Sequence, residues 1–81
     1  MSVTIYTTGP ACNKCNLTKK ALTKAGVLFT EILLSDDPDA KARFDAKGYT
    51  MAPIVVTDDD EWSDFRIDKI NGLIKAHAAA A

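Results

Sequence analysis

The sequence predicts a small α/β domain in which a four-stranded mixed sheet is flanked by three helices, in the order β-α-β-α-β-β-α. Short runs rich in β-branched and aromatic residues recur along the chain and indicate strands. Segments with helical spacing of apolar residues separate these runs, and glycine or proline stands near the changes between the two patterns. With 81 residues the chain is long enough for one such domain, so we assign residues 1–81 to it.

The first strand and the first helix are expected on either side of a Gly9-Pro10 break. Residues 3–7 have the composition of a buried strand, and the break ends it. Residues 13–25 follow with helical spacing, and Gly26 provides the usual C-terminal stop. The face of this helix that should be buried carries Leu17, Ala21, Leu22 and Ala25.

A second strand and a second helix are expected next. Residues 28–34 have strand composition, and the strand should run parallel to the first through a right-handed crossover. Residues 38–47 are predicted to form a helix with an aspartate near its N-cap, Pro38 in its first position and Gly48 as its stop. The apolar stripe of this helix is thin and consists mainly of Ala40 and Phe44.

The last part of the chain is predicted to form a hairpin and a helix. Pro53 cannot donate a hydrogen bond to a sheet, so it should stand at the start of the strand over residues 54–57. An aspartate-rich turn leads to a short antiparallel strand over residues 61–63. A helix should cover residues 67–78, and the alanines from Ala78 to Ala81 should fray. Its inward face should carry Ile67, Ile70, Leu73, Ile74 and, at its edge, His77.

The only two cysteines, Cys12 and Cys15, stand where the first helix should begin. The first turn of a helix has unpaired N–H groups and a positive dipole end, so a thiol there can have a lowered pKa and act as a nucleophile. A spacing of three residues places both sulfurs on one side of the helix, within reach of a disulfide. We therefore expect Cys12 to attack and Cys15 to resolve, with Lys14 helping to hold Cys12 ionised.

Two other uses of the cysteine pair are less favoured. A zinc site needs four ligands, and since His77 is the only other soft ligand, such a site would require two chains. A purely structural disulfide closing so short a loop would constrain the unfolded chain little. A thiol–disulfide redox site therefore remains the preferred interpretation.

Charge and hydropathy exclude several other classes. A net charge of −1 gives no general affinity for nucleic acid or anionic membranes. Residues 11–26 hold four lysines and no acid, whereas residues 58–64 hold five acids and no base, so a lysine face could steer an acidic protein partner. No apolar run approaches the ~18 residues of a membrane span, and no signal peptide is apparent. We expect a cytoplasmic monomer.

The predicted element order, with a cysteine pair opening the first helix and a proline opening the third strand, resembles the glutaredoxin branch of the thioredoxin fold. Glutaredoxins and thioredoxins share that proline in the cis form, facing the cysteines. The resemblance implies a cis Ala52–Pro53 bond packed against Cys12, with the backbone of Ala52 offered to an extended substrate. The residues alone would predict an ordinary trans bond.

Two further stretches are similar to the NrdH-redoxin family. These are Gly48-Tyr49-Thr50-Met51-Ala52-Pro53-Ile54-Val55-Val56 and Trp62-Ser63-Asp64-Phe65-Arg66-Ile67-Asp68-Lys69-Ile70. The resemblance implies a dithiol–disulfide oxidoreductase that thioredoxin reductase reduces with electrons from NADPH. It also implies that the protein passes these electrons to the large subunit of the class Ib ribonucleotide reductase, without a bound cofactor or metal.

The resemblance also implies which residues contact substrate or partner proteins. Trp62 is compatible equally with a core position and with a partner surface. Arg66 could pair with Asp64 or Asp68, or cap a carboxylate. The residues expected at the partner surface are Ala11, Lys14, Met51, Ala52, Pro53, Trp62, Ser63, Asp64, Phe65 and Arg66.

The chain departs from the family pattern at three places. Asp64 stands where the family usually has Gly, Ile67 where it has Pro, and Asn13-Lys14 where it has Val-Gln. Asp64 could raise the pKa of Cys12 if it lies close, and the central dipeptide should shift the redox poise.

Three alternatives remain open from the sequence. One is a glutathione-dependent glutaredoxin, although such a member should carry a Gly-Gly-x-Asp-type turn where residues 63–66 stand. Another is a zinc or iron–sulfur module in which two subunits share their Cys12 and Cys15. The last is a non-catalytic adaptor, which would have no need of two thiols at a helix start.

Overall fold

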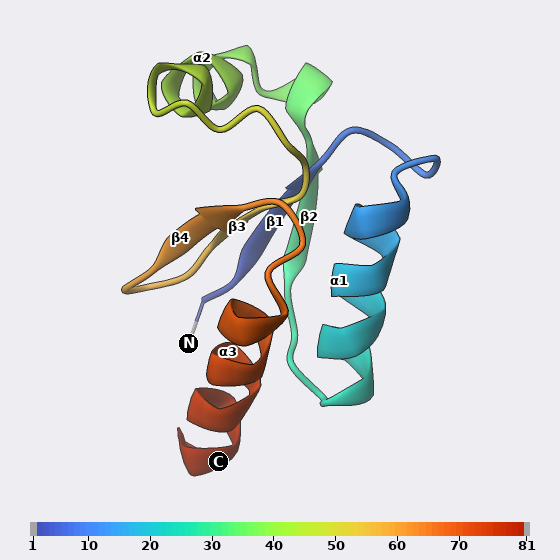
Figure 1. Ribbon diagram of the computed structural model, residues 1–81, viewed down its shortest axis with the longest axis vertical. Coiled ribbons are helices and arrows are strands. Elements are labelled where there is room, and N and C mark those ends of the chain that lie inside the picture. The colour runs from blue at the N-terminus through green and yellow to red at the C-terminus, as the bar shows by residue number, and fades with distance from the viewer. Residues whose placement is uncertain (1, 81) are drawn as a thin grey trace.

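A four-stranded mixed sheet lies between two helices on one face and a third helix on the other in the computed structural model, which describes residues 2–80 (Figure 1). The elements are β1 (Thr4–Thr7), α1 (Asn13–Lys24), β2 (Thr30–Leu33), a 3-10 turn (Leu34–Asp36), α2 (Pro38–Ala46), β3 (Ile54–Val56), β4 (Glu61–Ser63) and α3 (Ile67–Ala80). The predicted order of strands and helices is confirmed, and only the 3-10 turn was not expected.

The sheet has the strand order β2-β1-β3-β4. β1 runs parallel to β2, and β3 runs antiparallel to both β1 and β4. Val55 on β3 is therefore opposite Ile5 on β1 and Trp62 on β4. The predicted parallel first pair and antiparallel last pair are both confirmed, and β1, which leads into the cysteine pair, is held by a neighbour on each side.

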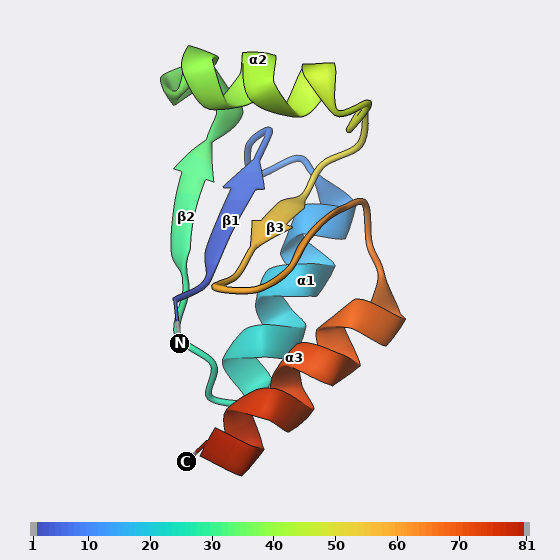
Figure 2. The ribbon, with the colours of Figure 1, turned by 90° about the vertical axis from the view of Figure 1, so that its left-hand side faces the viewer.

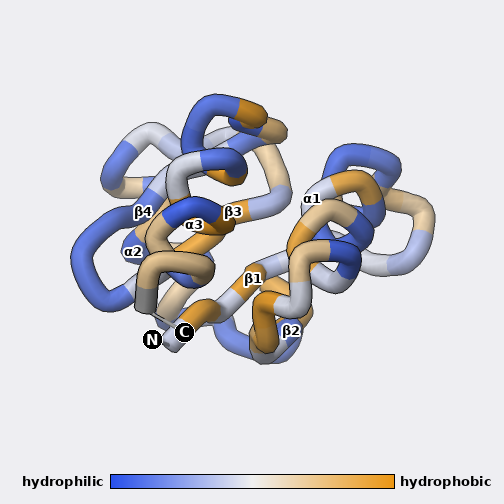
Figure 3. The backbone as a smooth tube through the Cα atoms, turned by 90° about the horizontal axis from the view of Figure 1, so that it is seen from below, coloured by the Kyte–Doolittle hydropathy of each residue, from blue (hydrophilic) through white to orange (hydrophobic). Residues whose placement is uncertain are grey.

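Strand side chains alternate between two hydrophobic clusters, as the pleat of a sheet requires. The larger cluster lies against α1 and α3, which run side by side (Figure 2), and contains Val3, Ile5, Leu22, Val27, Val55, Trp62, Ile70 and Leu73. The smaller cluster lies against α2 and contains Tyr6, Ala40, Phe44 and Ile54. Figure 3 shows hydrophobic segments along β1 and β2 and hydrophilic turns on the outside of α1. Both faces of the sheet are thus covered.

The second helix begins and packs as its sequence predicts. The Asp37 side chain caps it by accepting a hydrogen bond from the Ala40 N–H at 3.1 Å, and Pro38 follows at the first position. The Phe44 ring meets Tyr6 edge to face with 5.0 Å between the ring centroids. The thin apolar stripe is therefore enough to seat α2 on β1.

Two predicted core positions are wrong. Leu17 is 45% exposed because α1 turns Cys15, Thr18 and Leu22 toward the sheet instead. The buried Thr18 hydroxyl is satisfied by donating to the Lys14 carbonyl oxygen at 3.0 Å. Ile67, 52% exposed, is the first residue of α3 and lies outside the core.

The C-terminal end of α3 also differs from the prediction. The helix continues to Ala80, beyond the predicted end at Ala78, and alanine is the strongest helix former. Ala81 lies outside the described residues.

Candidate redox site

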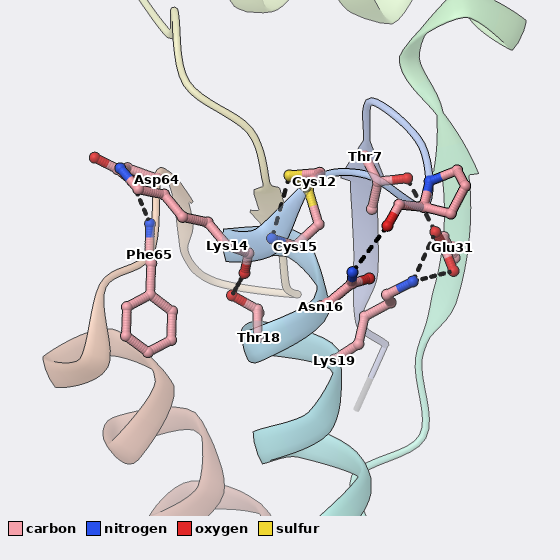
Figure 4. Close-up of a disulfide and its surroundings, with 11 residues drawn as sticks. Thr7, Cys12, Lys14, Cys15, Asn16, Thr18, Lys19, Glu31, Asp64 and Phe65 are labelled. Atoms are coloured by element: carbon pink, nitrogen blue, oxygen red, sulfur yellow. Dashed lines mark hydrogen bonds and ion pairs between the residues drawn. A yellow bond between two sulfur atoms is a disulfide. The ribbon is translucent and has the colours of Figure 1, made fainter.

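Cys12 and Cys15 lie at the start of α1 and are joined by a disulfide, with their Cα atoms 5.2 Å apart. Cys15 is completely buried, whereas Cys12 is partly exposed. Figure 4 shows the two sulfurs at the end of the helix, next to the loop that leaves β1. An incoming thiol or disulfide can therefore reach Cys12 but not Cys15.

Cys12 is the N-cap residue of α1. Its backbone is extended, with φ −77° and ψ 102°, and its sulfur accepts a hydrogen bond from the Cys15 N–H at 3.2 Å. This N–H is one of the groups that the first turn of a helix leaves unpaired. When the disulfide is reduced, the same N–H and the helix dipole are placed to stabilise a thiolate on Cys12.

The loop between β1 and α1 fixes the cysteine pair in this position. Gly9 has φ +125°, a region that L side chains rarely adopt, and its carbonyl oxygen accepts the Cys12 N–H at 3.1 Å. The Asn16 side-chain amide donates to the Pro10 carbonyl oxygen at 2.9 Å, which ties the loop back to α1. The Gly9-Pro10 break seen in the sequence is thus a hydrogen-bonded turn that leaves Cys12 partly exposed.

A shallow groove of about 450 Å³ runs beside Cys12. One wall is the start of α1 and the other is the segment that enters β3. The Ala52–Pro53 peptide bond in that segment is cis, as the resemblance implied, and Pro53 is buried. Besides Cys12, the residues lining the groove are Thr8, Ala11, Asn13, Lys14, Thr50, Met51 and Ala52.

The charge of Lys14 is directed at Asp64, not at Cys12. Its ammonium lies 2.8 Å from the Asp64 carboxylate, in the loop between β4 and α3 (Figure 4). This ion pair and the Phe65 N–H, which donates to the same carboxylate at 2.7 Å, hold the pKa of Asp64 below its usual value of 3.8. The prediction that Lys14 helps to ionise Cys12 therefore needs revision, because the carboxylate competes for the same charge.

A second charged contact, centred on Glu31, lies near the loop that carries Cys12. The buried Thr7 hydroxyl donates to Glu31 at 2.9 Å, and the Lys19 ammonium lies 3.1 Å from the same carboxylate. These two hydrogen bonds, that from Lys19 above all, hold the pKa of Glu31 below its usual value of 4.5. The contact joins β1, α1 and β2 just below the loop that carries Cys12.

Protonation of Glu31 should weaken the fold in acid. A carboxyl group whose pKa is lowered on folding contributes stability above its unfolded pKa, and this contribution is lost as the pH falls through the lower, folded pKa. We expect the difference in free energy of unfolding between the wild type and Glu31→Gln to shrink below pH 4.5. Urea denaturation at a series of pH values measures it, and a difference that stays constant through that range would contradict the assignment.

The residues expected at the partner surface separate into two groups. Ala11, Lys14, Met51 and Ala52 line the groove with Cys12, and Asp64 joins it through Lys14. Of the two positions left open for Trp62, the structure shows the core, because Trp62 is 4% exposed and belongs to the larger cluster. Ser63 is half-buried on β4, and Phe65 packs against that cluster. Neither of them lines the groove.

Arg66 is exposed and bound to a partner within the chain. Its guanidinium donates two hydrogen bonds to Asp68, at 3.1 Å and 2.9 Å. Of the two aspartates that the sequence offers as partners, the structure thus selects Asp68. The geometry gives Arg66 no direct contact with the cysteine pair.

The two charged surfaces seen in the sequence are partly neutralised within the chain. Of the four lysines on α1, Lys14 and Lys19 are held in ion pairs. On the acidic side, Asp60 pairs with Lys69 and Glu61 with Lys47. A lysine face that steers an acidic partner would therefore rest mainly on Lys20 and Lys24, away from the first turn of α1.

Asn13, which the sequence analysis already noted between the two cysteines, lines the groove. Three residues that sequence reasoning missed also help to shape the site. Thr8 and Thr50 line the groove, and Asn16 holds the Pro10 carbonyl. Small polar residues of this kind have no periodicity or motif that would distinguish them from ordinary loop residues. Only their spatial neighbours reveal their role.

The metal-binding alternative still requires a second chain. Within residues 2–80, no three His, Cys, Asp or Glu side chains gather as metal ligands would, so a zinc or iron–sulfur site would need a second chain.

Among the described helices, none is long and apolar enough to cross a membrane.

Comparisons with known proteins agree with this site. Residues 3–62 match the family model described as Glutaredoxin. The glutaredoxin-like protein NrdH of Escherichia coli K12 is 40% identical over 82 residues, an alignment that covers 100% of both chains. The protein of the same description from Lactococcus lactis subsp. cremoris is 31% identical and is covered to 97%, against 88% of this chain.

Solved structures extend the comparison to the fold. The glutaredoxin-like protein NrdH-redoxin from Escherichia coli, described as having a thioredoxin-like activity profile, superposes with a TM-score of 0.82 at 38% identity. The superposition covers 90% of this chain and 95% of that one. A glutaredoxin from Archaeoglobus fulgidus has a TM-score of 0.72 at 23% identity, over 90% of this chain and 85% of its own, which supports the fold alone.

Proposed function

The chain belongs to the NrdH glutaredoxin-like proteins of the glutaredoxin family, and from this premise we propose that it carries electrons from thioredoxin reductase to the class Ib ribonucleotide reductase. Its activity is thiol–disulfide exchange at the Cys12–Cys15 pair. NADPH supplies the electrons through the flavoprotein reductase, and the large subunit of the ribonucleotide reductase receives them. The protein works as a cytoplasmic monomer and needs no bound cofactor, because two sulfurs suffice to carry two electrons.

The first step uses Cys12 as the nucleophile. Its thiolate attacks one sulfur of the partner's disulfide, and the partner's other sulfur leaves as a thiolate. The segment with the cis Ala52–Pro53 bond forms the opposite wall of the groove and offers the backbone of Ala52 to an extended partner chain. This step leaves a mixed disulfide between Cys12 and the partner.

The second step uses Cys15 as the resolving cysteine. Its sulfur loses a proton and attacks the Cys12 sulfur, which closes the Cys12–Cys15 disulfide and releases the partner's second thiolate. Two electrons have then passed to the partner, and its two thiolates take up protons from the solvent. Complete burial of Cys15 restricts it to this intramolecular attack.

One observation supports thioredoxin reductase rather than glutathione as the electron source. The loop before α3 reads Ser63-Asp64-Phe65-Arg66, and its charges pair within the chain, Asp64 with Lys14 and Arg66 with Asp68. Neither a glycine pair nor an unpaired cation is left in this loop to receive the charged glutathione tripeptide. Full-length similarity to NrdH proteins supports the same choice.

Coupled NADPH oxidation tests the proposed electron source. The oxidised protein should be reduced rapidly by thioredoxin reductase and at least about tenfold more slowly by glutathione with glutathione reductase. The Cys12→Ser variant serves as the blank in both assays. Rapid reduction by glutathione alone would contradict the proposal and favour a glutaredoxin activity instead. The downstream step is tested by deoxyribonucleotide formation with the purified class Ib enzyme.

A further inference from the structure

We propose that Asp64 is a positioning residue for the thiol exchange, because its carboxylate holds the Lys14 ammonium away from Cys12 and so limits how readily Cys12 ionises. The inference rests on Cys12 as the attacking cysteine in the proposed function, but not on the identity of either protein partner. It concerns a contact between the first turn of α1 and the loop that enters α3.

The geometry directs Lys14 away from the sulfurs. In Figure 4 its side chain extends from the first turn of α1 toward Asp64, where the ammonium lies 2.8 Å from the carboxylate oxygen. Lys14 stands only two residues from Cys12 in the chain. A lysine side chain is long and flexible, so without Asp64 its charge would also reach positions next to Cys12.

Asp64 is held rigidly enough to act as an anchor. Its backbone has φ +72°, a left-handed conformation in which aspartate is better tolerated than most residues. The oxygen that binds Lys14 also accepts the Phe65 N–H at 2.7 Å, so the carboxylate is fixed from its own backbone. The anchor is therefore the loop, and Lys14 is the mobile partner.

The other charged groups near the site are already engaged. Arg66 is bound by Asp68 through two hydrogen bonds, and Lys19 is bound by Glu31 behind the loop. Among the residues that line the groove beside Cys12, only Lys14 carries a charge. The position of the Lys14 ammonium is thus the main variable charge at Cys12, in addition to the fixed dipole of α1.

The sign of the effect follows from the charges. A released ammonium would stabilise the Cys12 thiolate and lower the pKa of Cys12. The more acidic thiol would stabilise the reduced protein and make its disulfide the stronger oxidant. Asp64 therefore keeps the protein a better reductant than its helix-start cysteine and neighbouring lysine would make it alone.

A double-mutant cycle on the pKa of Cys12 tests the inference. The pH dependence of Cys12 alkylation in the reduced protein gives this pKa, and mass spectrometry assigns the modified cysteine. Asp64→Asn removes the carboxylate charge while keeping a side chain that tolerates the left-handed backbone and can still accept the Phe65 N–H. The pKa of Asp64 is already below 3.8, so its carboxylate stays charged while Cys12 titrates.

We expect Asp64→Asn to lower the pKa of Cys12 by about half a unit, or about threefold in the ratio of thiolate to thiol. Lys14→Gln should raise the pKa of Cys12, and by more in the Asp64→Asn protein than in the wild type, because only there is the ammonium free to approach the sulfur. High salt should reduce this difference. Lys20→Gln, an exposed lysine of the same helix, should have the same small effect in both backgrounds.

The possible outcomes separate the inference from the proposed function. An equal or smaller effect of Lys14→Gln in the Asp64→Asn protein would overturn the inference, since Asp64 would not be holding the lysine. Alkylation that falls first on Cys15 would overturn the role given to Cys12, and the inference with it. Neither result depends on thioredoxin reductase or ribonucleotide reductase, because the assay contains neither protein.

Discussion

Replacing Cys12 with serine should abolish electron transfer, with turnover reduced by several orders of magnitude. Cys12 is the partly exposed sulfur of the pair, and serine at this position offers a hydroxyl that hardly ionises at neutral pH. Cys15 remains in that variant, but it is completely buried and should not reach a partner's disulfide. Reduction of a protein disulfide, followed through NADPH consumption, measures the loss.

Cys15→Ser is the matched variant and should behave differently. Cys12 can still attack, so the first half of the exchange proceeds and releases one partner thiolate. The second half is blocked, and a covalent adduct through Cys12 should accumulate on a non-reducing gel and disappear with excess dithiothreitol. An adduct that forms with Cys12→Ser instead would reverse the roles of the two cysteines.

The parts of the molecule that the sequence predicts well are those with local causes. The β1 strand, the Gly9-Pro10 turn and the start of α1 each depend on residues that are neighbours in the chain. The same holds for the Asp37 cap and Pro38 at the start of α2. Because the cysteine pair sits in such a locally determined segment, its position at the start of α1 can be predicted without knowledge of the fold.

The prediction of a cis Ala52–Pro53 bond did not come from local residue chemistry. Residue chemistry alone favours the trans bond, and only the resemblance to glutaredoxins implied the cis form that the structure has. The segment that leads into this bond lies across a groove from residues 8–14, far away in the sequence. A tertiary constraint of this kind has no local signature.

Contacts between distant segments were the least predictable part of the site. Lys14 and Asp64 are fifty residues apart, and nothing in either local sequence indicates that they meet at 2.8 Å. The same reason explains Leu17, since the rotation of α1 depends on how the sheet and α3 pack against it. Helical spacing identified a face of α1 that is offset by about one residue from the buried one.

Trp62→Ala should destabilise the fold severely, with a cost of about 3–5 kcal/mol in the free energy of unfolding. Trp62 is 4% exposed and packs in the larger cluster. It is paired with Val55 on the neighbouring strand β3, and α3 covers this face of the sheet. Its removal would leave a cavity that the surrounding strands and α3 can fill only in part. Urea denaturation followed by circular dichroism measures the loss, since the only tryptophan is removed.

Trp62→Phe separates packing from polar contact. Within the described residues the indole Nε1 is buried without a hydrogen-bond partner, so losing this N–H should not itself weaken the fold. Phenylalanine retains most of the apolar contact, and we expect it to lose less than half of what alanine loses. If alanine instead left stability unchanged and only slowed reduction of a protein partner, Trp62 would have to contact that partner. If Trp62 belongs to the core, its replacement should lower the stability of the fold. The chemistry of Cys12 should be retained as long as the chain is folded.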